Sequence, residues 1–360
     1  MNGAVGILLA AALLGSSAAA APGGGGREAN LRLPLGRQLV RPAWRGKEPV
    51  PNKLIWPRGK RFAFSVLDDT DLATVANVGP VYRFLYEQGL RTTKTCWTVR
   101  GDPNRGRLPG QTCDDPEYLV WLQELQGQGF EIGWHNATWH GLPRPQTLAA
   151  LEKFAAHFGS YPRTAANHTG VEEGMYWAAA RLTGLHALAY NLLTRFSNTR
   201  KYQGHLEDSP FFWGDACREK ITYFRNFIFR GINTLQACPF MPYHDPLRPY
   251  VNSWFASSDG HDLDAFNQCL AEDEQDRLEN EQGACIMYVH FAKGFCEGGR
   301  LNPRFKLLVQ RLSEKNGWFV PVATLLDYLR AQHGTHEITA AERRSLERRW
   351  LLEKILVGTS

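Results

Sequence analysis

The sequence lacks the features that mark several large classes of protein. Its formal charge of +5 over 360 residues is modest, and its body contains no dense run of lysine and arginine. The electrostatic footprint of a nucleic-acid-binding protein is therefore missing. No segment reaches the roughly 20 apolar residues that a membrane-spanning helix needs, so we expect no stable transmembrane anchor. There is no internal repeat either, which argues against a solenoid or a propeller.

Cysteine is sparse, and its spacing argues against the common structural zinc sites. The seven cysteines include no Cys-x-x-Cys pair, so a zinc knuckle is not expected. Because seven is an odd number, at least one cysteine stays unpaired within the chain. Cys96 with Cys113 and Cys285 with Cys296 are close enough in sequence to form disulfides, but the sequence leaves the connectivity open.

The first 53 residues differ in character from the rest. An apolar segment from Val5 to Leu14 is followed by small residues, which is typical of a signal peptide, here over residues 1–20. No lysine or arginine precedes the apolar segment, which departs from the usual pattern. Residues 21–53 are rich in glycine and proline and predict a linker. We therefore expect an exported protein, periplasmic or extracellular.

The remaining residues predict an α/β fold. The chain is 43% hydrophobic and 21% charged, which is ordinary for a globular protein with a sizeable core. Strand-like runs alternate with helix-like runs, which is the pattern of βα units and a parallel sheet. We expect one catalytic domain over residues 54–335, followed by a basic C-terminal helix within residues 336–360.

The expected elements follow from runs of β-branched residues, apolar periodicity and turn signals. A long insert over residues 233–282 is expected to be an ordered irregular loop. The expected strands cover residues 61–67, 93–99, 130–134, 164–167, 187–193, 221–229, 285–289 and 318–322. The expected helices cover residues 80–89, 115–126, 145–158, 172–182, 303–316 and 323–332, with a last one starting after Thr339. The arginines of that last helix, from Arg343 onward, predict a solvated face, with Leu346 and Trp350 docked on the body. Contact of these arginines with an anionic polymer or lipid is the alternative.

Polar residues stand at the ends of three expected strands. Asp68 and Asp69 end the first, His135 and His140 follow the strand at residues 130–134, and His290 follows the strand at residues 285–289. Functional groups of parallel α/β folds collect at the carboxyl ends of the strands. Carboxylates and imidazoles are ligands of divalent metals. The pattern predicts one metal site, with Asp71 as an alternative that shares the metal with Asp69.

In element order, residues 54–334 resemble the polysaccharide deacetylase (NodB-homology) family of carbohydrate esterases. The shared features are the paired aspartates, the two histidines after a strand and the late histidine. The resemblance implies a distorted (β/α) barrel of about seven strands that binds one divalent metal, zinc first, with cobalt, nickel or manganese as alternatives. It implies that Asp68 is the general base, that Asp69, His135 and His140 are metal ligands, and that His290 is the general acid, oriented by Asp215.

Three features depart from the family pattern. His135 and His140 are five residues apart, where the family spaces these histidines by four. The arginine of the third family motif is absent, and Asn167 or His168 stands in its place, to orient the base or to add a ligand. Tyr288 occupies the position of a leucine that lines the acetyl pocket. Two tryptophans, Trp139 and Trp213, are further candidates to line a sugar site.

These residues predict a metal-dependent hydrolase that removes acyl groups, N-acetyl groups first, from a polysaccharide or glycan. The metal would activate water, an aspartate would take its proton, and a histidine would protonate the leaving amine. Two alternatives stay open at this point. One is a catalytically inactive relative that binds glycan, and the other is a metal hydrolase of a different carbon–nitrogen bond.

Overall fold

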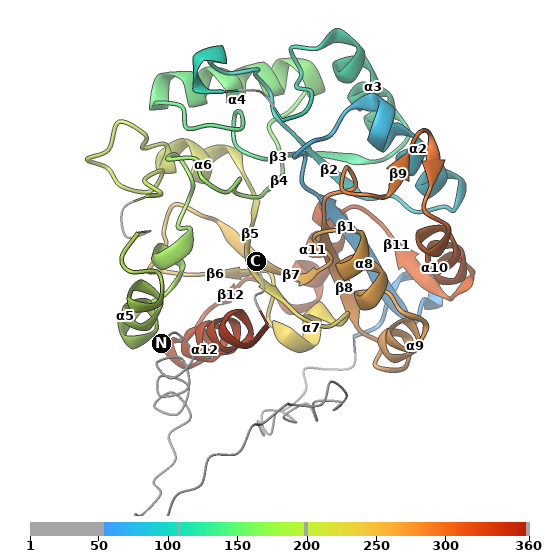
Figure 1. Cartoon of the computed structure of the whole chain (residues 1–360). Coiled ribbons are helices and arrows are strands. Elements are labelled where there is room, and N and C mark those ends of the chain that lie inside the picture. Colours follow the sequence, from blue (N-terminus) through green and yellow to red (C-terminus); the bar gives the residue numbers. More distant parts are fainter. Residues whose placement is uncertain (1–53, 107–108, 198–200, 358–360) are drawn as a thin grey trace, which may run out of the picture. The chain divides into compact units, whose positions relative to one another are not determined.

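The computed structural model describes residues 54–106, 109–197 and 201–357 (Figure 1). The chain divides into two units, of which Ile55–Ser360 is the second. The expected signal peptide and linker lie outside the described residues. All the described helices and strands belong to the second unit.

Seven parallel strands close a barrel. Each strand pairs in parallel with the next, and the last pairs with the first. The long strands are buried along almost their whole length, because side chains fill the barrel and helices cover it. In order around the ring, the strands are β1 (Phe62–Asp68), β2 (Thr93–Cys96), β3 (Glu131–Trp134), β4 (Thr164–Ala165), β5 (Tyr223–Phe229), β7 (Ser253–Asp259) and β8 (Ala284–Val289). The prediction of a barrel of about seven strands is confirmed.

Short strands extend the barrel on two sides. β11 (Gly317–Phe319) pairs in parallel with β1, and β6 (Tyr243–His244) pairs antiparallel with β7. β12 (His336–Glu337) then pairs in parallel with β6. A separate hairpin is formed by β9 (Cys296–Glu297) and β10 (Arg300–Leu301).

The helices surround the barrel (Figure 1). In α10 (Pro303–Glu314) the buried residues Phe305, Leu308, Val309 and Leu312 recur every three to four positions, so one face packs on the body. The other helices are α2 (Val75–Glu87), α3 (Pro116–Gly127), α4 (Arg144–Phe158), α5 (Gly184–Leu193), α6 (Gly214–Lys220), α7 (Thr234–Ala237), α8 (Leu263–Cys269), α9 (Glu272–Asn280), α11 (Val322–His333) and α12 (Ala340–Val357), with 3₁₀ turns η1 (Pro57–Gly59), η2 (Pro103–Arg105) and η3 (Ala178–Arg181). Within the described ranges, no helix combines the length and the apolar character that crossing a membrane requires.

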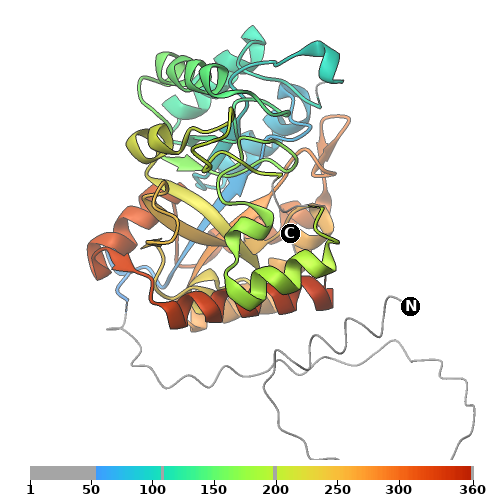
Figure 2. The same ribbon diagram turned by 90° about the vertical axis from the view of Figure 1, so that its left-hand side faces the viewer.

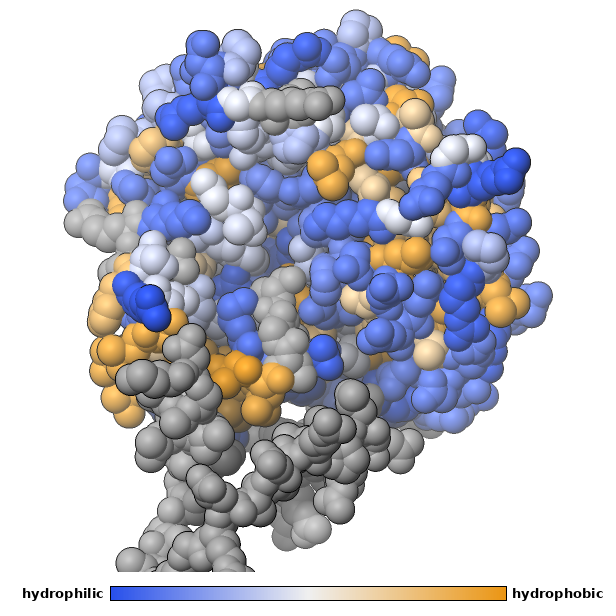
Figure 3. All heavy atoms as spheres, in the orientation of Figure 1, coloured by the Kyte–Doolittle hydropathy of each residue, from blue (hydrophilic) through white to orange (hydrophobic). Residues whose placement is uncertain are grey.

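Two predicted elements are wrong. The expected loop at residues 233–282 contains barrel strand β7. This strand was not predicted because it contains several serines, and small polar residues are unusual in a buried strand. The expected strand at residues 187–193 belongs to helix α5. That helix exposes Leu185, Leu188 and Leu192 to solvent, visible as an apolar area where Figure 1 places α5 (Figure 3). With apolar side chains on both its faces, α5 lacks the periodicity that identifies a surface helix.

Two predicted helices differ in extent. Helix α2 begins at Val75, five residues before the predicted start, because Thr74 and Asn77 form a capping box ahead of Pro80. Of the helix predicted at residues 172–182, only the short turn η3 forms.

The seven cysteines are free thiols in the structure. The Sγ atoms of Cys96 and Cys113 lie 3.7 Å apart, which is hydrogen-bonding contact and not a disulfide bond. Cys285 is buried in β8, whereas Cys296 is partly exposed in β9.

Helix α12 packs on the barrel and beside α5 (Figure 2). Leu346, Trp350 and Leu351 of α12 are buried. Arg343 is also buried and forms an ion pair with Asp245, so the expectation of a solvated arginine face is wrong at this position. The C-terminal helix is therefore part of the folded body.

The buried face of α12 predicts a measurable contribution to stability. Leu351 is fully buried, so Leu351→Ala should lower the free energy of unfolding by about 2–5 kcal/mol. The matched control is Leu356→Ala, because Leu356 is 71% exposed and its change should stay within about 0.5 kcal/mol. Urea unfolding measures both. Equal values for the two variants would show that α12 does not pack as described.

Candidate metal centre

One cavity of about 400 Å³ lies at the carboxyl ends of the barrel strands. Residues that follow the strands of a parallel barrel collect at this end. The cavity is lined by groups that follow β1, β3, β4 and β8 or stand in β5. These are Asp69, Asp71, His135, His168, Arg225 and His290.

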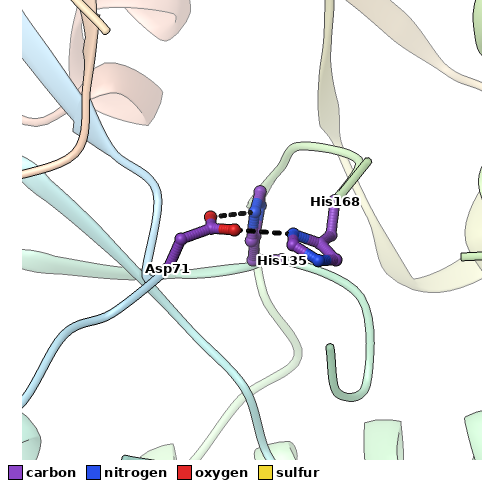
Figure 4. Close-up of side chains that lie close together, drawn as sticks. All are labelled: Asp71, His135 and His168. Atoms are coloured by element: carbon purple, nitrogen blue, oxygen red, sulfur yellow. Dashed lines mark hydrogen bonds and ion pairs between the residues drawn. The ribbon is translucent and has the colours of Figure 1, made fainter. Parts of the chain in front are cut away.

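Asp71, His135 and His168 point toward one another (Figure 4). Asp71 lies three residues beyond β1, His135 directly follows β3, and His168 lies three residues beyond β4. The Asp71 carboxylate is 3.1 Å from His135 Nε2 through Oδ2 and 2.9 Å from His168 Nδ1 through Oδ1. Burial raises the pKa of Asp71, but the hydrogen bonds from these imidazoles and His290 outweigh it and hold the pKa well below its usual range.

This cluster fits a divalent metal. Two imidazole nitrogens and one carboxylate are a common protein ligand set that leaves a coordination position open. One ligand atom from each of the three residues lies within 4.8 Å of the other two, so a single ion could contact all three. The ring of Trp97 packs against both imidazoles, with centroids 6.5 Å from His135 and 5.3 Å from His168. His135 Nδ1 has no hydrogen-bond partner within the described part of the chain, so the side chain is held by ring packing and by the contact of Nε2 with Asp71.

Asp69 forms a buried, two-pronged ion pair with Arg225 of β5. Arg225 Nη1 donates to Oδ1 at 2.9 Å, and Nη2 donates to Oδ2 at 2.6 Å. Burial raises the pKa of Asp69, but the Arg225 charge outweighs it and the pKa is lowered. Asp69 is therefore an ionised carboxylate at neutral pH, and its Oδ2 lies 3.8 Å from His135 Nε2. The Arg225 guanidinium also lies 4.3 Å from the centre of the Tyr288 ring.

His290 completes the cluster from β8. Its Nδ1 lies 2.7 Å from the carbonyl oxygen of His261, a contact that requires Nδ1 to carry a proton and donate it. Its Nε2 lies 3.4 Å from Asp71 Oδ2. Nδ1 is thus bound to the backbone, and Nε2 is the ring nitrogen near Asp71 in the cavity.

The structure does not bring His140 to the expected ligand set. His140 Nε2 accepts the Asp102 N–H at 2.7 Å, and its Nδ1 contacts the Gly141 carbonyl at 3.1 Å. Both ring nitrogens are therefore used by the backbone. The chain turns after β3 through Asn136, whose φ is +59°, and so His140 follows a different path from His135. His168 takes the place beside His135 that the sequence assigned to His140.

Asp68 is also placed differently from the expected general base. It is fully buried and does not line the cavity. Its Oδ2 accepts from Tyr82 Oη at 3.0 Å and lies 3.1 Å from Lys94 Nζ, while Oδ1 accepts from the Phe291 N–H at 2.9 Å. Held in this way, Asp68 connects β1 to β2 and to the residues that follow β8.

The remaining predicted residues lie around the site or away from it. Asp215 is on the exposed part of α6 and pairs with Arg144 at 2.6 Å, so it does not contact His290. The Asn167 amide bonds the backbone of Met175 and thereby holds the loop after β4. Tyr288 lines the cavity, whereas Trp139 and Trp213 do not.

The sequence interpretation missed Arg225. An arginine inside the apolar run of β5 (Tyr223–Phe229) is costly to bury without a partner, and this could have indicated a buried carboxylate facing it. Arg225 stands on the barrel strand that follows β4 and binds the Asp69 carboxylate.

No protein-family model and no curated protein matches this sequence. Solved structures similar to it include polysaccharide deacetylases. A protein assigned as one, from Mycobacterium smegmatis, has 13% identity and a TM-score of 0.47, with 80% of this chain and 96% of that chain covered. Another, from Pseudomonas aeruginosa, has 14% identity and a TM-score of 0.42, with coverage of 77% and 94%. The Puue allantoinase has 15% identity and a TM-score of 0.42, with coverage of 79% and 98%. At these values the likeness assigns neither substrate nor residue roles.

The geometry predicts which histidine holds a metal. His168→Ala should weaken zinc binding by at least about tenfold, since even loss of an outer partner of a ligand costs about 10- to 100-fold. His140→Ala is the matched control and should leave zinc affinity unchanged, because both its ring nitrogens contact backbone. Competition with a chromophoric chelator measures both affinities. Weaker binding in the His140 variant alone would restore the ligand set expected from the sequence.

Proposed function

We propose that this protein is an exported, metal-dependent hydrolase that removes acyl groups, N-acetyl groups first, from a polysaccharide or glycan. The observation that supports this most strongly is the convergence of Asp71, His135 and His168 beside the Arg225-bound Asp69 and His290 in one cavity. Export rests on the N-terminal sequence alone.

The proposed roles of the aspartates differ from those that the family resemblance implies. Asp69 replaces Asp68 as the base, and Asp71 replaces Asp69 as the metal ligand. Asp71, His135 and His168 would hold the metal, zinc first, which supplies Lewis-acid chemistry that lowers the pKa of water and polarises a carbonyl. Asp69, ionised and fixed by Arg225, accepts the proton from the attacking water. Each Asp69 oxygen has a second lone pair available for this, beyond the one that Arg225 uses.

His290 is placed to protonate the leaving amine. Its Nδ1–H donates to the His261 carbonyl oxygen, so the proton to be transferred is on Nε2, in the same cavity as Asp69. Amide hydrolysis requires a general acid and a general base. His290 and the Arg225-bound Asp69 line one cavity and could supply them.

The reading as an inactive glycan-binding relative loses its main support. The missing third-motif arginine and Tyr288 both favoured that interpretation, but Arg225 now binds the carboxylate proposed as base. Tyr288 does replace the expected leucine, but its ring contacts the Arg225 guanidinium and so supports the same pair.

The assignment of Asp69 predicts a specific loss of activity. Asp69→Asn should lower kcat for acetate release from N-acetylated oligosaccharides by about 10²- to 10⁴-fold, because the amide cannot accept the proton. Asp215→Asn is the control and should keep kcat, since Asp215 pairs with Arg144 at the surface. Zinc uptake by the Asp69 variant shows whether its site is intact. Full activity of that variant would reject Asp69 as base, and no release by the wild type from any acylated glycan would reject the proposed function.

A further inference from the structure

Five residues that line the same cavity, called here its cationic end, are not used by the mechanism. They are Arg181, Tyr190, Lys201, Tyr202 and Lys354. Arg181, at the end of η3, lines the cavity and is only 2% exposed. Its Nε and Nη1 have no hydrogen-bond partner in the part of the chain that the structure describes. The guanidinium lies 3.5 Å from the ring centre of Trp177 and 4.6 Å from that of Trp350. Aromatic rings thus hold the guanidinium, and its Nε and Nη1 donors are available to a ligand.

A buried arginine without a carboxylate is costly, because its desolvation is not compensated. Burial lowers the pKa of Arg181 to about 10, so the group remains a cation at neutral pH. Stacking on two indoles offsets part of the cost but bonds none of the N–H groups. Structural arginines of this fold are bonded, as Arg225 is to Asp69 and Arg343 to Asp245. Arg181 therefore has the surroundings of a ligand-binding group.

The charges on the rest of the lining favour an anion at this end. Lys201 and Lys354 line the same cavity. The two lining carboxylates are both engaged at the other end, Asp69 with Arg225 and Asp71 with the imidazoles. Among the described residues, neither lining carboxylate forms an ion pair with Arg181.

Aromatic and hydroxyl groups complete this end. Tyr190 and Tyr202 line the cavity beside Arg181. The Tyr202 hydroxyl oxygen accepts the Gly170 N–H at 3.2 Å, which leaves the hydroxyl proton to donate to a ligand. Two non-glycine residues at the start of η3 have positive φ, Tyr176 just before it at +44° and Ala178, its first residue, at +53°. A strained backbone of this kind is retained where the surrounding structure needs the side chains in place.

We infer that the substrate carries an anionic group, a carboxylate or a sulfate on the glycan, which Arg181 binds while the acyl group lies at Asp71, His135 and His168. This deepens the proposed function and rests on it. The planar guanidinium fork matches the oxygens of either group. An acidic, N-acylated glycan is thus the substrate class, and a neutral one should be a poor substrate.

The test compares three oligosaccharides of equal length with the zinc-loaded protein. One is a neutral N-acetylglucosamine tetramer, one alternates N-acetylglucosamine with glucuronate, and one is an O-sulfated N-acetylglucosamine tetramer. Arg181→Met removes the charge and keeps a similar stem. It should lower the ratio of kcat/KM between the better anionic substrate and the neutral one by about 10- to 100-fold, the range for a charged hydrogen bond. The two anionic probes show which anion is bound.

The control variant is Arg91→Met, which removes an arginine stacked 3.9 Å from a ring centre, that of Tyr86, outside the cavity. It should leave the ratio unchanged. Calorimetric binding of the same oligosaccharides gives a readout that does not need turnover. Weaker binding of the anionic probe alone to the Arg181 variant supports the inference even if no acetate is released, in which case only the proposed function fails. If the Arg181 variant loses affinity equally for the charged and the neutral oligosaccharides, or loses none, the inference is overturned.

Discussion

The buried ion pair between Asp69 and Arg225 determines how the rest of the site is arranged. It links the end of β1 to β5, two strands on different sides of the barrel, through two parallel hydrogen bonds. Removing one partner would leave an uncompensated buried charge, which typically costs about 3–5 kcal/mol. Arg225 binds both oxygens of Asp69, while the Asp71 carboxylate contacts His135 and His168.

Barrel closure supplies the convergence that this site needs. Asp69 and His290 are more than 200 residues apart in sequence, yet β1 and β8 are neighbours because the seventh strand pairs with the first. Asp69 and His290 thus reach the same cavity from the first and the last strand of the barrel. The cationic end comes from elements outside the barrel, with Arg181 from η3 and Lys354 from α12. Helix α12 therefore contributes to the cavity as well as to the fold.

The sequence predicted the barrel and the neighbourhood of the site, but not the individual contacts. Strands such as β8 were predictable because apolar runs bounded by turns are strong local signals, whereas β7 is rich in serine and its burial is set by its neighbours. His135 was predictable from its place after a strand. Whether His140 or His168 joins it depends on the path of the loop after β3, and the partner of Asp69 depends on a strand more than 150 residues away. These choices are tertiary: the arginine in the apolar run of β5 indicates a buried carboxylate partner but does not say which one.

The central claim is that one divalent metal is held by Asp71, His135 and His168. The most direct measurement is a crystal structure of the zinc-soaked protein with data collected on both sides of the zinc absorption edge. We predict a single strong anomalous peak in the cavity, within bonding distance of these three side chains, with Asp69 still bound to Arg225. A peak bonded by His140, or by Asp69 in place of Asp71, would contradict the account.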